Sequence, residues 1–230
     1  MIPNWYPEHP PIYDIEKTYS ENLENGPFFD GKLFKEKKQA SSIDFLGHKI
    51  HAPIGVAAGP LLNAKWVSLA AALGFDILTY KTIRSSAHPA HLMPNVIYVE
   101  KKDLHTARKI EAPEQDLSSL TITNSFGMPS QSPDYLLQDI EKANQSLGTG
   151  QILIVSVAGT PNQGMSFREN FIQTALFAKS AGAKIIEANF SQYRSDGRIS
   201  LHESGGGLRI CQIDCKCHQT HSSSSQSRSL

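Results

Sequence analysis

Apolar runs that end in small or polar residues alternate, along the middle of the chain, with segments of helical periodicity. The order strand, helix, strand occurs twice. The six segments are 53–60, 63–75, 76–82, 151–159, 165–183 and 184–191. The strands are almost wholly apolar instead of alternating, which is typical of a parallel sheet covered by helices. The pattern therefore predicts an α/β fold, either a doubly wound sheet or a TIM-type (β/α) barrel.

The second predicted helix shows the clearest periodicity. Phe171, Ala175 and Ala178 fall on one face of it, and Gly182 stands where a glycine in left-handed conformation ends a helix. A polar lead-in of about 40 residues precedes the repeated units, with a helix predicted near 12–23. A long insertion, 83–150, separates the two units.

Composition narrows the class of partner. The chain has 22 Lys and Arg against 22 Asp and Glu, without a basic block that would grip nucleic acid or an anionic membrane. The N-terminus lacks the pattern of a signal peptide, and no apolar run reaches the roughly 20 residues that span a bilayer. We therefore expect a cytoplasmic protein that binds small molecules, with no membrane span and no nucleic acid partner. All three cysteines follow residue 210, so no disulfide framework supports the main body.

Polar residues at the ends of the predicted strands are candidates for function, because the carboxyl ends of strands form the active site in (β/α) barrels. Lys81 and Asn189 stand at such ends. The alternative is that Lys81 extends to solvent and Asn189 caps the next helix. The segment 121–130 is a turn by itself, but its Asn124 could equally pair with the amide-like edge of a planar heterocycle.

Five short motifs occur in order between residues 43 and 191: APIGVAAGP, LTYKTIRSSAHP, NSFGMPS, IVSVAGT and IIEANFS. In sequence and spacing they resemble the motifs of dihydroorotate dehydrogenases, flavoproteins of pyrimidine biosynthesis with a (β/α) barrel. The resemblance implies FMN as the cofactor, dihydroorotate and orotate as ligands, and a homodimer in the intact form. Related dihydropyrimidine dehydrogenase-like flavoproteins share much of the pattern, so that alternative stays open, and the electron acceptor is left undetermined.

The resemblance also implies site residues. Those expected to contact FMN are Ala57, Ala58, Gly59, Lys81, Thr82 and Asn189. Those expected to contact the substrate are Lys81, Asn124, Ser125, Phe126, Gly127, Met128 and Asn189. In this arrangement the lysine would stabilise negative charge that builds on the flavin during hydride transfer.

The chain departs from the family after Ser191. The family continues Asn-x-Ser-Cys-Pro-Asn, in which the cysteine is the catalytic base, whereas this chain has Gln192, Tyr193 and Arg194. A glutamine amide cannot act as a general base. The resemblance therefore leaves no intact catalytic base, and we expect the chain as written to be inactive.

The segment 192–230 has no strand or helix periodicity. Read one base later, Ser191 to Tyr193 permits Pro-Asn-Ile, which restores the Pro-Asn of the family, and two further runs permit family-like sequence. We therefore interpret 192–230 as an out-of-frame, disordered tail, after an N-terminal extension, 1–42, and a partial barrel, 43–191. That part supplies about four of the eight strands of a barrel.

A metal site in the tail is the next interpretation to weigh. The cysteines and histidines of the tail offer soft ligands, but their spacing fits structural zinc motifs poorly, so we expect no metal site. The ligand candidates are Cys211, Cys215, Cys217, His218 and His221. The chain is thus either an FMN-dependent oxidoreductase by descent or a non-catalytic half-barrel fragment.

Overall fold

The computed structural model describes residues 12–31, 33, 42–101, 107–110, 121–160 and 164–190. Its helices are α1 (Tyr19–Asn25), α2 (Ala64–Ala72), α3 (Pro133–Gln145) and α4 (Phe167–Ser180). Its strands are β1 (Ile43–Phe45), β2 (His48–Ile50), β3 (Gly55–Val56), β4 (Ile77–Ile83), β5 (Val96–Lys101), β6 (Ala107–Ile110), β7 (Ile122–Asn124), β8 (Ile152–Val157) and β9 (Ile185–Ala188).

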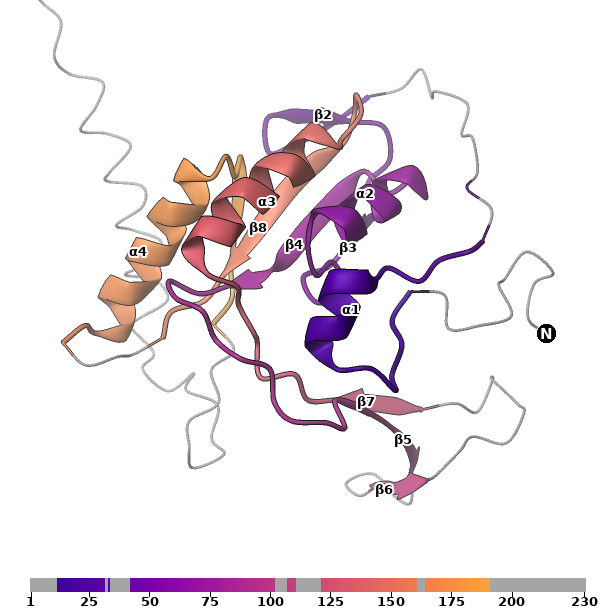
Figure 1. Ribbon diagram of the computed structural model, residues 1–230. Coiled ribbons are helices and arrows are strands. Elements are labelled where there is room, and N and C mark those ends of the chain that lie inside the picture. The colour runs from indigo at the N-terminus through magenta and orange to yellow at the C-terminus, as the bar shows by residue number, and fades with distance from the viewer. Residues whose placement is uncertain are drawn as a thin grey trace, which may run out of the picture.

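The main sheet has the order β3-β4-β8-β9, and every neighbouring pair is parallel. The strands follow one another along the chain, and α2, α3 and α4 lie on one face of the sheet (Figure 1). This arrangement confirms the predicted α/β fold with consecutive strand–helix units. All six predicted segments form the expected element. Five of these elements are shorter than the apolar pattern indicated, and β4 is shifted by one residue toward the C-terminus.

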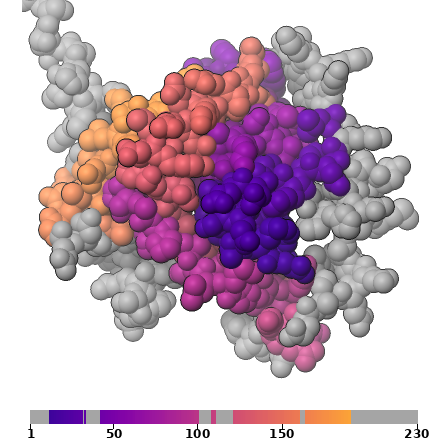
Figure 2. All heavy atoms as spheres, in the orientation of Figure 1, coloured from indigo at the N-terminus to yellow at the C-terminus, as the bar shows by residue number. Residues whose placement is uncertain are grey.

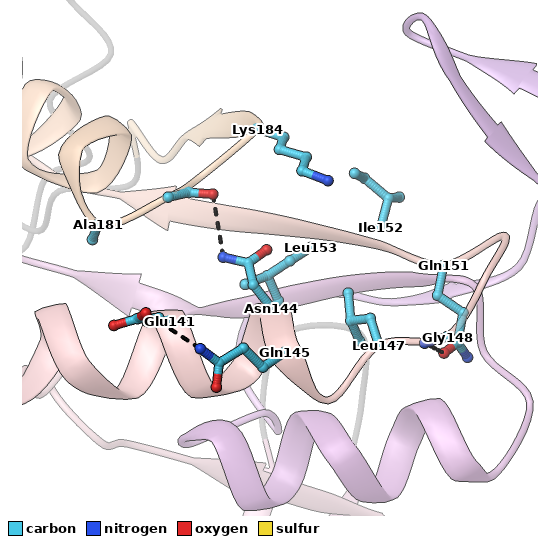
Figure 3. A pocket seen from close by; sticks show the side chains of 11 residues that line it. Glu141, Asn144, Gln145, Leu147, Gly148, Gln151, Ile152, Leu153, Ala181 and Lys184 are labelled. Atoms are coloured by element: carbon cyan, nitrogen blue, oxygen red, sulfur yellow. Dashed lines mark hydrogen bonds between the residues drawn. The ribbon is translucent and has the colours of Figure 1, made fainter.

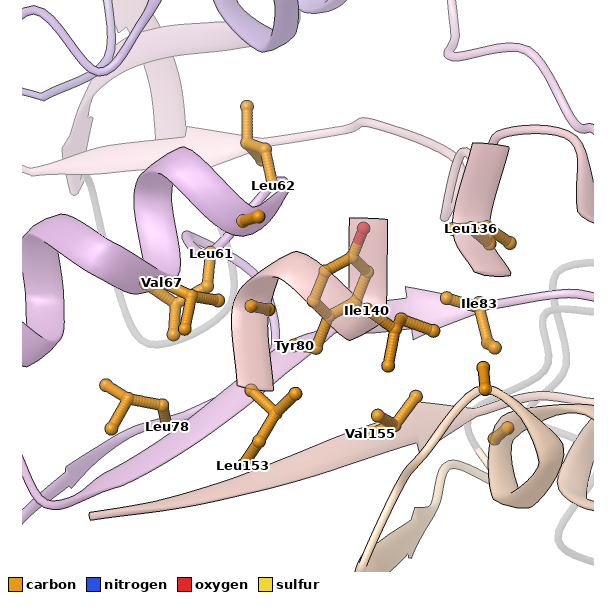
Figure 4. Packing of buried hydrophobic residues seen from close by; sticks show 14 of the residues in the cluster. Leu61, Leu62, Val67, Leu78, Tyr80, Ile83, Leu136, Ile140, Leu153 and Val155 are labelled. Atoms are coloured by element: carbon orange, nitrogen blue, oxygen red, sulfur yellow. The ribbon is translucent and has the colours of Figure 1, made fainter. Parts of the chain in front are cut away.

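The core lies between the sheet and these helices. Cross-strand partners share a face of a sheet, and the pairs Leu78–Leu153 and Tyr80–Val155 are buried toward α2 and α3. There they pack among side chains such as Val67 and Ile140, as Figure 4 shows.

The predicted face of α4 is buried in the same core. Phe171, Ala175 and Ala178 all belong to it. Gly182 follows the end of α4 with a φ of +99°, in the left-handed conformation expected for it.

The segment predicted as one long insertion is divided by the structure. Its first part carries an antiparallel sheet of order β6-β5-β7, and its last part is α3, the crossover helix between β4 and β8. The helix has recognisable signals that the sequence analysis passed over: Ser132 accepts from the N–H of Tyr135, and Pro133 opens the first turn. A hairpin, β1–β2, was also not predicted.

Helix α1 begins later than predicted, because Thr18 and Glu21 form a reciprocal capping box that fixes its first turn. Tyr19 and Leu23 are buried in the main core. The Nδ2 of Asn63 also donates to the carbonyl of Leu23 at 2.8 Å. Part of the predicted N-terminal extension therefore packs into the main body, and Figure 2 shows this indigo segment seated among the purple and magenta ones.

No helix within the described ranges is long and apolar enough to cross a membrane.

Candidate functional site

The parallel strands bring the carboxyl ends of four predicted segments to one edge of the main sheet. Lys81 lies near the carboxyl end of β4, and Gly59, Gly159 and Asn189 follow the ends of β3, β8 and β9. Because all four strands run in the same direction, their carboxyl ends meet at the same edge. The predicted common edge is confirmed.

A polar cluster joins three of these strands. The hydroxyls of Thr82 and Ser156 are 2.9 Å apart, and the Nδ2 of Asn189 donates to the Thr82 hydroxyl at 3.1 Å. The same Nδ2 lies 3.8 Å from the sulfur of Met128, in the loop that follows β7. Ser156 was not predicted, although it is the single polar residue within β8 and its side chain is fully buried.

Lys81 is a buried cation with an aromatic environment. Its side chain is 8% exposed, and its Nζ lies 5.9 Å from the ring centre of Tyr19 and 6.0 Å from that of Phe126. Burial lowers the pKa of Lys81 from 10.5 to about 8. No carboxylate within the described ranges forms an ion pair with it. A buried ammonium without a counterion favours an anionic ligand.

Tyr19 is the functional candidate that the sequence analysis missed because it lies in the predicted extension. Its ring packs edge-on against Phe126 at 5.9 Å, and Phe126 also meets Tyr13 at 5.5 Å. These rings surround the stem of the lysine with apolar surface, and the faces of Tyr19 and Phe126 attract its ammonium. No spacing relative to the barrel motifs could have indicated this contact.

The loop 124–128 presents unpaired backbone donors. The carbonyls of Gly127 and Met128 accept from the Arg84 guanidinium at 3.4 and 3.0 Å, and that of Phe126 accepts from a backbone N–H at 3.0 Å. In contrast, the N–H groups of Phe126, Gly127 and Met128 have no hydrogen-bond partner in the part of the chain described here. Three successive N–H groups without a partner are donors that an anionic ligand can accept from.

The backbone of this loop is held in an uncommon conformation. Gly127 has a φ of +76° and Met128 a φ of +49°. Positive φ is uncommon for a residue with a side chain such as methionine. Asn124, at the end of β7, is exposed and its side chain forms no hydrogen bond with another described residue. Ser125 is exposed as well and bonds to His91.

Arg84 fixes this loop to the main sheet and was not singled out from the sequence. It is 8% exposed, and besides the two loop carbonyls it donates to the Thr160 hydroxyl at 2.5 Å. Burial lowers its pKa. An arginine three residues after a buried lysine in an apolar strand is a signal that could have been noticed, since buried guanidinium groups are rare without partners.

The end of β3 carries the small residues expected beneath a flat ring. Ala57 is exposed, whereas Ala58 and Gly59 are half-buried. At Gly59 no atom lies within 4 Å of the position that a Cβ would take, so its backbone faces open space. This surface fits a planar group, and Lys81, Thr82 and Asn189 lie at the same edge of the sheet. The residues present therefore fit the implied flavin.

Other candidates fall outside this site or outside the described residues. The base position, Gln192, and the cysteines and histidines of the tail lie beyond residue 190. Within the described ranges, no group of three potential metal ligands occurs. A cavity of about 450 Å³ opens at the opposite edge of the sheet, between α3 and the starts of β8 and β9 (Figure 3). It is lined by residues such as Glu141 and Lys184 and contains none of the predicted site residues.

Comparison with known proteins gives a sequence relative and a set of structural neighbours. The chain is 45% identical over 203 residues to a dihydroorotate dehydrogenase of Dictyostelium discoideum, and the match covers 81% of this chain and 54% of the relative. It also resembles a crystal structure of DHODH from Eimeria tenella in complex with ferulenol, with a TM-score of 0.51 and 18% identity. That likeness covers 76% of this chain and 43% of the other. No family model matches.

The fold and the geometry of the site define an α/β protein with a buried lysine at the carboxyl edge of a parallel sheet. The resemblance to the dihydroorotate dehydrogenase family is confirmed over the part that the sequences share. It spans about half the length of the relative that it matches.

Proposed function

We propose that the edge formed by Lys81, Thr82, Asn189 and the loop 124–128 is a site for dihydroorotate and orotate in an FMN-dependent oxidoreductase. The observation that carries the proposal is the pairing of a buried ammonium, Lys81, with free backbone N–H groups. Phe126 belongs to both parts, since its ring contacts the lysine and its N–H is unpaired. Orotate is a planar heterocycle with a carboxylate, and these groups complement its negative charge.

The same observation favours dihydroorotate over the ligands of a dihydropyrimidine dehydrogenase-like enzyme. A neutral pyrimidine such as uracil lacks the carboxylate and would leave the Lys81 ammonium buried without a counterion. Leaving a buried charge unpaired on binding costs affinity.

FMN is proposed at the end of β3 and beside the polar cluster. Ala57, Ala58 and Gly59 would face the ring, and Lys81, Thr82 and Asn189 would hold its polar edge. The chemistry that FMN supplies when bound is acceptance of a hydride from the substrate. Lys81 would stabilise negative charge on the polar edge of the bound ring.

The proton that leaves the substrate needs a base, and the family position for it holds Gln192 in this chain. We therefore propose that the chain binds the ligand of the family but does not oxidise it. The four parallel strands are proposed to be part of a (β/α) barrel. The segment 192–230 is proposed to be an out-of-frame tail, and it has the length of most of the 19% of the chain that the sequence match does not cover.

Calorimetric titration tests the proposed site. Orotate should bind the full chain, uracil should bind at least about tenfold more weakly, and Lys81→Met should remove the preference. Lys184→Met, which alters an exposed lysine at the opposite edge, is the matched control and should bind orotate as the original chain does. Equal affinity for orotate and uracil would show that the site does not recognise a carboxylate.

A further inference from the structure

We propose that His91 is a positioning residue, which holds the loop 124–128 so that its free N–H groups stay available to the ligand. The inference rests on the proposed function of that loop. His91 is not one of the predicted site residues. It lies in the segment 88–95, between β4 and β5.

Three contacts join His91 to the loop. Its Nδ1 lies 2.9 Å from the Ser125 hydroxyl, and its backbone N–H donates to the carbonyl of Phe126 at 3.0 Å. Its ring lies against Gly127, where the first atom of any side chain would stand 2.5 Å from Cδ2 and Nε2 of the imidazole. One residue thus contacts three successive loop residues, through its backbone, its polar atom and its ring.

The rest of segment 88–95 fixes His91 itself. Asn95 is buried, and its Nδ2 donates to the carbonyl of His91 at 2.9 Å and to that of Ser125 at 3.2 Å. The backbone N–H of Ser125 donates to the carbonyl of Asn95 at 2.8 Å. At the other end, His88 and Ser130 exchange two backbone hydrogen bonds. These hydrogen bonds fix the segment beside the loop, in a position from which the side chain of His91 contacts it.

The imidazole is exposed, so its side chain adds little to the core, and its contacts are with the loop. The loop needs such support because Met128 is held at a positive φ, which a side chain disfavours. Arg84 fixes the carbonyls of Gly127 and Met128, and His91 fixes Ser125 and the face of Gly127. Without the imidazole, Asn95 is the one residue of this segment whose side chain still bonds to the loop, among the described contacts.

Two variants and one control test the inference. His91→Ala removes the ring and its polar atom, whereas His91→Asn keeps a polar atom near the place of Nδ1. His88→Ala is the matched control, because the His88 contacts with Ser130 are made by backbone atoms. Each chain is studied by amide hydrogen exchange of the peptide covering 121–130, by orotate titration and by thermal unfolding.

We expect His91→Ala to speed exchange in this peptide and to weaken orotate binding about tenfold, the scale of one lost hydrogen bond and a less ordered site. His91→Asn should recover most of both effects, and the melting temperature should change little in every variant. Unchanged exchange and unchanged affinity in His91→Ala would overturn the inference, as would equal effects of His88→Ala. If the original chain binds no orotate, the proposed function fails, and faster exchange in His91→Ala alone still supports the positioning role.

Discussion

Replacing Lys81 by methionine should make the protein more stable at pH 7 while destroying its anion site. The lysine is 8% exposed and its pKa falls from 10.5 to about 8 because burial disfavours the charged form. At about 1.4 kcal/mol per pH unit, that difference corresponds to roughly 3 kcal/mol of destabilisation at neutral pH. The attraction of the ammonium to Tyr19 and Phe126 stabilises the original chain by about 0.5–2 kcal/mol. This attraction is lost in Lys81→Met and partly offsets the gain. We therefore expect a net gain of about 1–3 kcal/mol for Lys81→Met.

The pH dependence has a defined sign. Between about pH 8 and 10.5 the unfolded chain holds the proton on Lys81 and the folded chain has lost it. Stability therefore rises with pH across this window relative to a chain without the group. Below pH 8 both states are protonated, and the full penalty is present.

Urea unfolding of the original chain, Lys81→Met and Lys184→Met at pH 7 and pH 10 measures this effect. The advantage of Lys81→Met over the original chain should be largest at pH 7 and should shrink at pH 10, whereas Lys184→Met should track the original chain. Comparison with the variants cancels the titration of tyrosines and exposed lysines. A Lys81→Met protein that is less stable than the original at pH 7, with the same dependence on pH, would refute the reasoning.

Two other changes have expected outcomes. Asp139→Ala should lower the free energy of unfolding, measured in urea, by about 2–4 kcal/mol. The buried carboxylate accepts from the Tyr80 hydroxyl at 2.6 Å and from the Ala64 N–H at 2.7 Å, and both donors would lose their partner. A loss below about 1 kcal/mol would show that water replaces the carboxylate. With added FMN, Gln192→Cys in the present chain should not reduce dichloroindophenol with dihydroorotate as the donor. A chain restored to the family reading frame should do so, because a thiolate acts only on a positioned substrate. Activity in the single variant would contradict the proposal that the chain as written is inactive.

The strand and helix units could be predicted because their apolar patterns are nearly complete. The apolar run at 151–159 is β8 in the structure, and the buried face of α4 was read correctly from Phe171, Ala175 and Ala178. Helix α3 was missed because its residues were grouped with an insertion that also contains β5 to β7. Its own signals at Ser132 and Pro133 are local and were sufficient to find it.

The site was predictable where it lies at strand ends and not where it depends on tertiary contact. The positions of Lys81 and Asn189 follow from parallel strands that end at one edge. The contact of Lys81 with Tyr19 joins residues 62 positions apart, and nothing in the local sequence around either one indicates it. The unpaired N–H groups of the loop 126–128 are a property of backbone geometry, which residue types alone do not determine.

Orotate titration followed by the amide resonances of the ¹⁵N-labelled full chain tests the central claim most directly. The account predicts that the signals of Phe126, Gly127 and Met128 move together with saturation at one affinity, because their free N–H groups receive the anion, and that Lys81→Met abolishes these shifts. Signals that move instead around Glu141 and Lys184, at the opposite edge of the sheet, or no shifts at all, would contradict the assignment of the anion site to the carboxyl ends of the strands.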